Sequence, residues 1–239
     1  RVCYHPCENS CNRKDLDTPV SIHAVERFLG DEALKNDWQY TPITFSSGKK
    51  IMIVGAGPSG LSAAYHLRKL GHEVTIFEAG PVAGGMMNFG IPAYRMPRNI
   101  LQAEIKRIEN FGVKIVLNYK VADILKEKEN GGFDAVFVAI GAHFAKKVNI
   151  PAQEASKILD AVSFLKDADE NSDNKPLLGR RVAIYGGGNT AMDAARTAKR
   201  LGADEAMIIY RRDREHMPAH EFEADEALSE GVKIHWLSS

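Results

Sequence analysis

Residues 50–80 read KIMIVGAGPSGLSAAYHLRKLGHEVTIFEAG and decide the fold of this chain. The apolar run Ile51–Val54 leads into the glycine-rich turn Gly55–Gly60, and a helix-forming segment follows. A second apolar run, Val74–Phe77, then ends at Glu78. A strand, glycine turn, helix, strand and acid within about thirty residues are typical of a Rossmann-like unit that binds an adenine dinucleotide. We therefore predict an α/β fold; the alternative is an ordinary glycine-rich turn.

Each part of this stretch has a physical role. Gly55 permits a tight turn, Gly57 lets a pyrophosphate approach the backbone, and Gly60 lets the helix pack closely on the strand. The helix N-terminus offers unpaired N–H groups and the positive end of its dipole to the phosphates. Glu78 is placed to hydrogen-bond a ribose hydroxyl.

The same unit recurs 131 residues later, when Lys50 is aligned with Arg181. KIMIVGAGPSGLSAAYHLRKLG then lies over RVAIYGGGNTAMDAARTAKRLG, with glycine matched to glycine at Gly186 and Gly188. The third glycine becomes Ala191, which the motif tolerates because only close packing of helix on strand is needed there. The repeat predicts a second dinucleotide-binding unit.

The two copies differ at the residue that follows the second strand, which is the acid Glu78 in the first copy. The second copy carries one extra residue before its second strand, so the position that matches Glu78 is Tyr210, and Arg211 and Arg212 follow it. A carboxylate accepts a hydrogen bond from a ribose 2′-hydroxyl but repels a 2′-phosphate, whereas guanidinium groups pair with phosphate. We predict that the second site prefers NADP(H) to NAD(H). The alternative is a pair of ordinary surface arginines at a strand end.

The remaining segments complete the expected layout. The Gly/Met-rich loop 84–92 suits either a flat ligand resting on backbone or a core-facing loop, and the strand 134–142 ends in small residues at Gly141, where a cofactor could lie against the backbone. Further elements follow from periodicity and turn residues. They are helices at 19–34, 98–111 and 219–230, strands at 113–117 and 232–237, and connectors at 35–48 and 167–177.

Composition excludes several classes of protein. The 239 residues include 31 Lys+Arg and 31 Asp+Glu, so no electrostatic case exists for nucleic acid or an anionic membrane surface. No apolar run approaches the roughly 18 residues of a membrane span, and we expect no signal peptide. The chain starts at Arg1 rather than Met, so we expect a fragment or a processed chain. With its cysteines confined to one short segment, we expect a cytoplasmic, reducing setting.

Cys3, Cys7 and Cys11 are the three cysteines and form the spacing C-x3-C-x3-C. Clustered thiols without disulfide partners suggest soft-metal ligands, and iron–sulfur clusters take Cys thiolates. Zinc binding or free thiols are the alternatives. Three thiols cannot complete a four-cysteine site, so further ligands are expected from upstream or elsewhere in the fold. His216 and His220 flank Pro218 without an HExxH pattern, so we predict no zinc site there.

Four segments together resemble one known family. They are the cysteine run with PVSIHAVERF, the loop GGMMNFGIPAYRMPRNILQAEIKRIENFGV, the repeat GGGNTAMDAARTAKRLGA, and YRRDREHMPA. The chain is similar, over nearly its whole length, to the glutamate synthase small-subunit family, which includes the NADPH-input part of dihydropyrimidine dehydrogenase. The resemblance implies electron flow from NADPH to FAD and through 4Fe–4S clusters to a larger partner subunit or domain. Glutamate synthase has five residues between the first two cysteines where this chain has three, which indicates a sister group.

The resemblance also implies roles for individual residues, although no catalytic side chain. FAD would contact Gly55, Gly57, Pro58, Ser59, Gly60, Glu78, Gly85, Met86, Arg95, Val121 and, at the end of the strand, Gly141. NADPH would contact Gly186, Gly188, Asn189, Thr190, Ala191, Arg211 and Arg212. The clusters would take Cys3, Cys7 and Cys11, serving two different clusters, with Glu26 near one of them.

The expected organisation is an α/β chain with two tandem Rossmann-like dinucleotide-binding domains. Residues 1–47 would end a helical iron–sulfur domain and 48–166 would bind FAD. A linker at 167–178 would lead to an NAD(P)H-binding domain at 179–239, incomplete at its C-terminus. Two alternatives remain. A thioredoxin-reductase-like enzyme shares the tandem fold but needs a redox CxxC, and residues 178–239 contain no cysteine. A non-catalytic FAD-binding relay or assembly subunit is the other.

Overall fold

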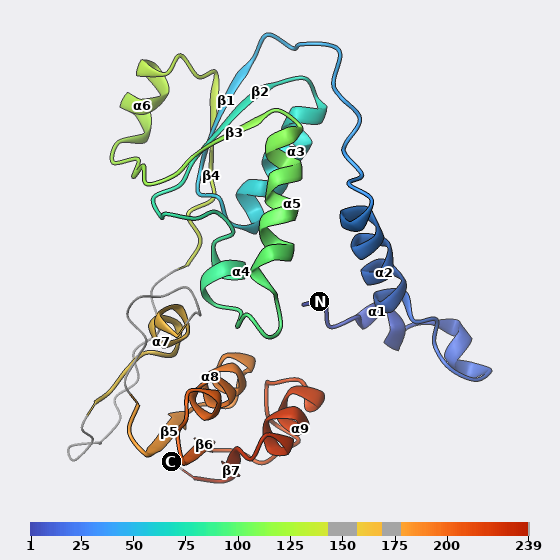
Figure 1. Cartoon of the computed structure of the whole chain (residues 1–239), viewed down its shortest axis with the longest axis vertical. Coiled ribbons are helices and arrows are strands. Elements are labelled where there is room, and N and C mark those ends of the chain that lie inside the picture. The colour runs from blue at the N-terminus through green and yellow to red at the C-terminus, as the bar shows by residue number, and fades with distance from the viewer. Residues whose placement is uncertain (143–156, 169–177, 239) are drawn as a thin grey trace. The chain divides into compact units, whose positions relative to one another are not determined.

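The computed structural model describes residues 1–142, 157–168 and 178–238. These form two compact units, one made of Arg1–Asn88 and Tyr94–Gly141, the other of Phe89–Ala93 and Ala142–Ser239. Each unit has its own parallel sheet with helices packed on it (Figure 1). The predicted α/β fold with a repeated unit is therefore confirmed.

The first unit is built on a four-stranded parallel sheet in the order β3-β2-β1-β4. Helices α3 and α5 pack against each other, α3 on β1 and β2 and α5 on β3, while α6 contacts β4. The bounds of these elements are β1 Lys50–Val54, α3 Pro58–Lys69, β2 Glu73–Phe77, α4 Met86–Phe89, α5 Arg98–Asn110, β3 Val113–Val116, α6 Ile124–Asn130 and β4 Ala135–Val138.

The apolar runs of the sequence become the core of this sheet. Met52, Ile53 and Ile76 are completely buried, at 0% exposure. Successive residues of β1 point to opposite faces, so an unbroken apolar run such as Ile51–Val54 is what a parallel sheet covered on both faces requires. The edge strand β4 differs, because Phe137 and its neighbours remain partly exposed.

Ahead of the sheet lie short helices and a connector. They are α1 (Pro6–Asn9), the 3-10 turn η1 (Asn12–Asp15) and α2 (Ile22–Lys35), which replaces the expected helix 19–34. Val25, Phe28 and Leu29, which share one side of α2, are each more than half exposed. The connector is tied to α5, because Arg107 Nε donates to the Trp38 carbonyl at 2.9 Å and its guanidinium stacks over Tyr40.

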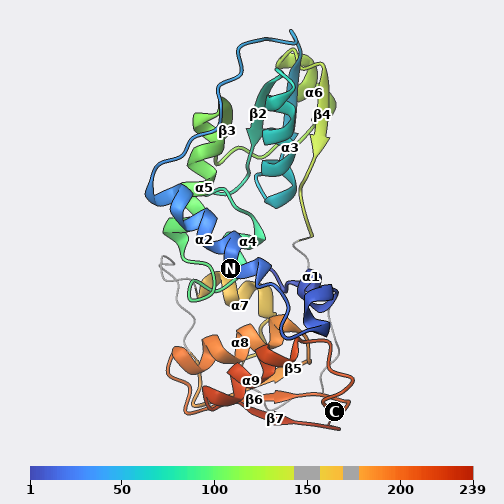
Figure 2. The ribbon, with the colours of Figure 1, turned by 90° about the vertical axis from the view of Figure 1, so that its right-hand side faces the viewer.

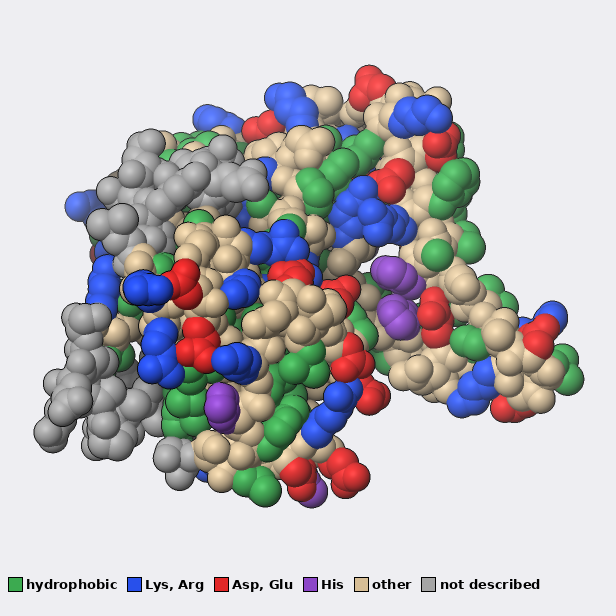
Figure 3. All heavy atoms as spheres, turned by 60° about the horizontal axis from the view of Figure 1, so that its bottom comes forward, with side chains coloured by type: hydrophobic (Ala, Val, Ile, Leu, Met, Phe, Trp, Pro, Cys, Tyr) green, Lys and Arg blue, Asp and Glu red, His purple; other side chains and the backbone are tan. Residues whose placement is uncertain are grey.

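The second unit repeats the arrangement with a three-stranded parallel sheet in the order β5-β6-β7. Helix α8 contacts β5, β6, α7 and α9 (Figure 2). The bounds are α7 Ala161–Asp167, β5 Arg181–Tyr185, α8 Asn189–Arg200, β6 Glu205–Ile209, α9 Glu221–Ser229 and β7 Lys233–His235. Acidic and basic side chains are interspersed over the face in Figure 3, in keeping with the balanced charge of the sequence. Within the part of the chain that the structure describes, no helix has the length and apolar character to cross a membrane.

An ionic network joins α8 to α9. Arg196 is buried and binds Glu226 at 2.6 Å and Glu230 at 2.7 Å, while Arg200 binds Glu230 at 2.7 Å. Partial burial alone would raise the pKa of Glu230, but hydrogen bonds from Arg200 and Arg196 outweigh it and hold that pKa below its ordinary value. The ionised carboxylate therefore stabilises the packing of the two helices.

Replacing Glu230 by Gln should loosen α8 in a pH-dependent way. Because the folded pKa is the lower one, the stabilisation is complete above the ordinary glutamate pKa of about 4.3 and is lost as the pH falls through the folded value. At pH 7 we expect Glu230→Gln to lower the opening free energy of α8 by about 1 kcal/mol. Hydrogen exchange of α8 amides measures this. The difference from wild type should shrink below pH 4, and Glu215→Gln, an exposed carboxylate of the same unit, should change nothing.

Candidate functional site

The first glycine turn is formed by direct backbone contacts. Gly55 has φ of 105°, and a Cβ there would lie 2.4 Å from the Ala139 carbonyl oxygen at the end of β4. A Cβ on Gly60 would lie only 1.9 Å from the Gly55 oxygen and 3.3 Å from the Ile53 side chain. Helix α3 can therefore rest on the strand–turn backbone only because residue 60 has no side chain, as its role in the motif predicts.

A second loop lies against this turn. The Gly84 N–H donates to the Ala56 carbonyl at 2.8 Å, and a Cβ on Gly85 would lie 2.8 Å from the Gly57 Cα. A Cβ on Gly57 itself would have the Gly85 Cα as its nearest neighbour, at 3.9 Å. Gly57 is also the N-cap of α3, with Pro58 and Ser59 in its first turn. The structure thus brings the predicted residues of the Gly/Met loop and the glycine turn together in one backbone-lined cradle.

The Glu78 carboxylate stabilises the cradle by accepting two backbone hydrogen bonds. Its Oε2 accepts from the Ala56 N–H and its Oε1 from the Gly80 N–H, both at 2.8 Å. A carboxylate oxygen has two lone pairs, so each can also accept from a ribose hydroxyl. The bracing of the glycine turn by Glu78 is a role that the sequence analysis missed, because nothing in local spacing indicates which amide the carboxylate reaches.

Four further predicted residues belong to the same unit. Arg95 is half-buried, and its Nη2 donates to the hydroxyl of Tyr4, within the cysteine segment, at 3.3 Å. Val121 is half-buried between β3 and α6. Gly141 follows β4, is exposed and has φ of 70°. Met86, also half-buried, opens α4.

The second glycine turn has the same backbone course with a looser fit. The Gly186 N–H donates to the Ile209 carbonyl at 3.1 Å, as Gly55 does to Phe77 in the first copy. Ala191 is buried, and its Cβ would lie 4.0 Å from one built on Gly186, so this turn has room for the methyl group. Gly188 is the N-cap of α8, and Asn189 and Thr190 form the first turn of that helix.

Tyr210 and the two arginines occupy the end of β6. The Tyr210 ring lies under the turn, since a Cβ on Gly187 would be 2.5 Å from it, and the Tyr210 hydroxyl donates to the His216 carbonyl at 2.7 Å. Arg211 and Arg212 are exposed, and neither guanidinium has a hydrogen bond or ion pair within the described residues. A carboxylate therefore marks the first site and two available cations mark the second.

The loop after the arginines is joined to the glycine turn. The Ala219 N–H donates to the Gly187 carbonyl and the His220 N–H to Asn189 Oδ1, both at 3.0 Å. These bonds keep residues 219 and 220 out of helical geometry, so α9 begins at Glu221 instead of the predicted residue 219. Sequence reasoning missed the contribution of Gly187, although a third consecutive glycine was a visible signal.

The cysteine segment presents its thiols at the surface. Cys3 and Cys7 are exposed, and Cys11 is half-buried. Backbone hydrogen bonds, first at Val20 and then at Arg13, lower the pKa of the Cys11 thiol, which favours the thiolate that binds metals. Among residues 1–142, 157–168 and 178–238, no group of three or more His, Cys, Asp or Glu side chains is arranged to hold a metal ion. The iron–sulfur assignment stays a prediction.

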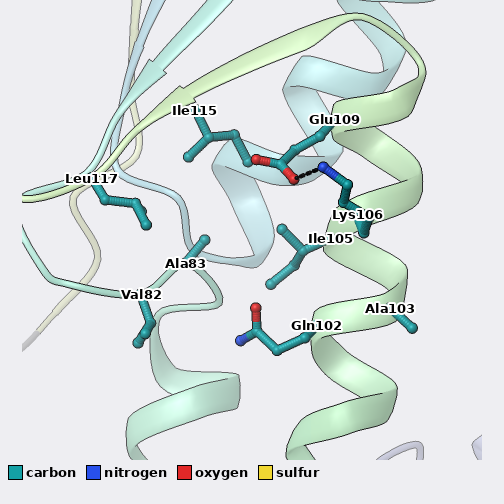
Figure 4. Close-up of a pocket in the computed structure, with 9 residues that line it drawn as sticks. All are labelled: Val82, Ala83, Gln102, Ala103, Ile105, Lys106, Glu109, Ile115 and Leu117. Carbon is teal, nitrogen blue, oxygen red and sulfur yellow. Dashed lines mark hydrogen bonds and ion pairs between the residues drawn. The ribbon is translucent and has the colours of Figure 1, made fainter.

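A surface groove of about 510 Å³ lies between α5, β3 and the loop before α4 (Figure 4). An ion pair between Lys106 and Glu109, at 3.2 Å, stands at its rim. None of the predicted cofactor residues lines it, so no role follows for it. Its lining comprises Val82, Ala83, Gln102, Ala103, Ile105, Lys106, Glu109, Ile115 and Leu117.

Comparison with known proteins matches this chain to a family of oxidoreductases and to several of its members. The sequence pattern of the pyridine nucleotide-disulphide oxidoreductases matches residues 32–239. The chain is 43% identical to the NADP(+)-dependent formate dehydrogenase subunit beta of Moorella thermoacetica, over 99% of this chain and 37% of that protein. It is 32% identical to the glutamate synthase (NADPH) small chain of Escherichia coli K12, over 98% of this chain and 52% of that one. FprA of Mycobacterium tuberculosis, solved with NADPH, shares the fold with a TM-score of 0.64 at 24% identity, over 77% of this chain and 48% of FprA.

A methyl group at residue 60 should be costly. Because its Cβ would collide with the Gly55 oxygen, we expect Gly60→Ala to lower the free energy of unfolding of the first unit by about 2–3 kcal/mol. Thermal unfolding of the purified protein measures this. Gly30→Ala is the matched control, because a Cβ on this α2 residue would have no neighbour within 4 Å outside the local helix backbone, so it should be neutral or stabilise by up to about 1 kcal/mol. Equal effects of the two substitutions would contradict the packing argument.

Proposed function

Because this chain belongs to the pyridine nucleotide-disulphide oxidoreductase family, we propose that it accepts hydride from NADPH onto FAD and passes single electrons through 4Fe–4S clusters to a partner subunit or domain. The match to a glutamate synthase small chain confirms the family resemblance. The observation that carries the proposal is the pair of glycine turns, one braced by Glu78 and the other followed by Arg211 and Arg212.

The first turn fits FAD. Gly57 and Gly85 leave a surface without side chains on which a pyrophosphate can rest, and α3 directs its N-terminus there. Glu78 would hold the ribose, and Arg95, Val121 and Gly141 would contact other parts of the cofactor. FAD, when bound, supplies the exchange between two-electron and one-electron chemistry, so the side chains serve to bind and orient it rather than to transfer protons. The proposed FAD domain spans 48–166.

The second turn fits NADPH. Gly188 opens α8 toward the pyrophosphate, and the guanidinium groups of Arg211 and Arg212 are available for a 2′-phosphate. A disulfide reductase would instead need a redox-active CxxC, and the three cysteines of the sequence are spaced C-x3-C. The proposed NADPH domain spans 179–239.

Electrons are proposed to leave the flavin through clusters bound by the cysteine segment. Cys3, Cys7 and Cys11 supply three thiolates, and cubane clusters need four ligands each, so further ligands must join them. The formate dehydrogenase relative is named as a beta subunit, which supports a larger partner that takes part in electron transfer. The chain spans about a third of that relative, so the partner and its substrate are part of the proposal.

Anaerobic mixing with each nicotinamide tests the hydride step. NADPH should bleach the flavin absorbance faster than NADH at equal concentration. Each charged hydrogen bond to phosphate contributes roughly 1.5–3 kcal/mol, so Arg211→Ala with Arg212→Ala should raise the KM for NADPH at least about tenfold and leave the KM for NADH nearly unchanged. Arg180→Ala is the control, since that arginine lies at the opposite end of β5 and pairs with Asp204.

Two outcomes would contradict the proposal. Bleaching by NADH that equals or exceeds bleaching by NADPH would remove the role of the arginines. Bound flavin that neither nicotinamide reduces would favour a non-catalytic relay or assembly subunit.

Replacing the cysteines separates the electron exit from the hydride step. We expect Cys3→Ser, Cys7→Ser and Cys11→Ser each to lower the iron content and the paramagnetic signal of the reduced protein. Flavin content and the rate of flavin bleaching by NADPH should stay within about twofold of wild type, because the thiols take no part in hydride transfer. Metal analysis and low-temperature electron paramagnetic resonance provide the readout. Zinc in place of iron, or iron unchanged in all three variants, would exclude the cluster assignment.

A further inference from the structure

Tyr210 does more than replace an acid. Its side chain is 8% exposed, and its ring fills the space beneath Gly187, where a Cβ would lie 2.5 Å from the ring. Its hydroxyl reaches over the next five residues and donates to the His216 carbonyl at 2.7 Å. One residue thus both supports the glycine turn and closes the loop that begins with Arg211.

The far end of the same loop is joined to the same turn. Ala219 donates to the Gly187 carbonyl and His220 to Asn189 Oδ1. Residues 211–218, which we call the arginine loop, are therefore held at their start, at His216 and at their end. Such closure lowers the conformational freedom that a ligand would otherwise have to remove on binding.

Some charged side chains of the arginine loop form ion pairs and others do not. Arg214 binds Asp225 at 2.6 Å, and Asp213 binds the His216 ring at 2.6 Å. Arg211 and Arg212 keep their guanidinium groups free of such partners within the described part of the chain. Asp213 and Arg214 thus have partners, whereas Arg211, Arg212 and the exposed Glu215 have none in the described part of the chain.

We propose that Tyr210 is a positioning residue that selects the 2′-phosphorylated dinucleotide through the arginine loop, an inference that rests on the proposed NADPH function. The hydroxyl holds the backbone at His216, the loop keeps a fixed course from β6 to α9, and Arg211 and Arg212 stay beside the glycine turn. Tyr210 itself need not touch the phosphate. A ring that merely fills space would not need the hydroxyl.

Tyr210→Phe removes the hydroxyl and leaves the ring. In the complete protein, we expect it to weaken binding of adenosine 2′,5′-bisphosphate about three- to tenfold, the effect of one hydrogen bond, measured by isothermal titration. Binding of adenosine 5′-monophosphate, which lacks the 2′-phosphate, should not change. In turnover, the KM for NADPH should rise by the same factor, with kcat and the KM for NADH unchanged. Tyr40→Phe, in the aromatic cluster of the first unit, is the matched control and should have no effect.

Coupling to the arginines decides between positioning and simple packing. If Tyr210 acts through the loop, Tyr210→Phe should have no further effect once Arg211 and Arg212 are both Ala. Equal weakening of both nucleotides, or a full effect in the arginine-free background, would overturn the inference while NADPH preference stood. Wild-type protein that binds the two nucleotides equally would overturn the NADPH assignment, and this inference with it.

Discussion

The contact between α3 and the first glycine turn is the constraint on which the cofactor-binding part of the molecule depends. With 1.9 Å between a Cβ at residue 60 and the Gly55 oxygen, only glycine lets the helix come down onto the turn. Once it does, α3 begins at its N-cap Gly57, and Gly84 and Gly85 pack against the same backbone. The cradle is thus made of main chain, which suits a ligand whose recognition depends on phosphate rather than on a particular side chain.

The glycine turn is stabilised by different residues in the two copies of the unit. In the first, Glu78 accepts from the Ala56 N–H. In the second, an aromatic ring packs beneath Gly187, the residue that aligns with Ala56, and the loop beyond it is joined to the carbonyl of Gly187. The exchange of a carboxylate for a ring therefore alters both the charge at the end of the second strand and the way the neighbouring loop is anchored. A change in cofactor preference that altered charge alone would leave that loop without its support.

Much of this could be predicted from sequence, because the fold depends on local patterns. The apolar run of β1, the motif glycines and the repeat at 131 residues each follow from spacing, and the structure gives Gly60 and Ala191 the packing roles expected of them. Contacts between distant residues carry no such pattern. The hydrogen bond from Ala56 to Glu78, that from His220 to Asn189, and the exposed apolar side of α2 all depend on how segments meet. The three cysteines are close in sequence, yet their spacing does not indicate which further residues would complete a metal site with them.

The two buried clusters described for this chain have no member in common, one being centred on Ile53 and Ile76 and the other on Met192 and Ile208. Each unit therefore has a hydrophobic core of its own. A ligand stabilises only the equilibrium of the fold that it binds. Under the proposed assignment of FAD to the first unit and NADPH to the second, the two cofactors would protect different halves of the chain from proteolysis, and a cell short of one cofactor would leave the corresponding half vulnerable while the other persisted.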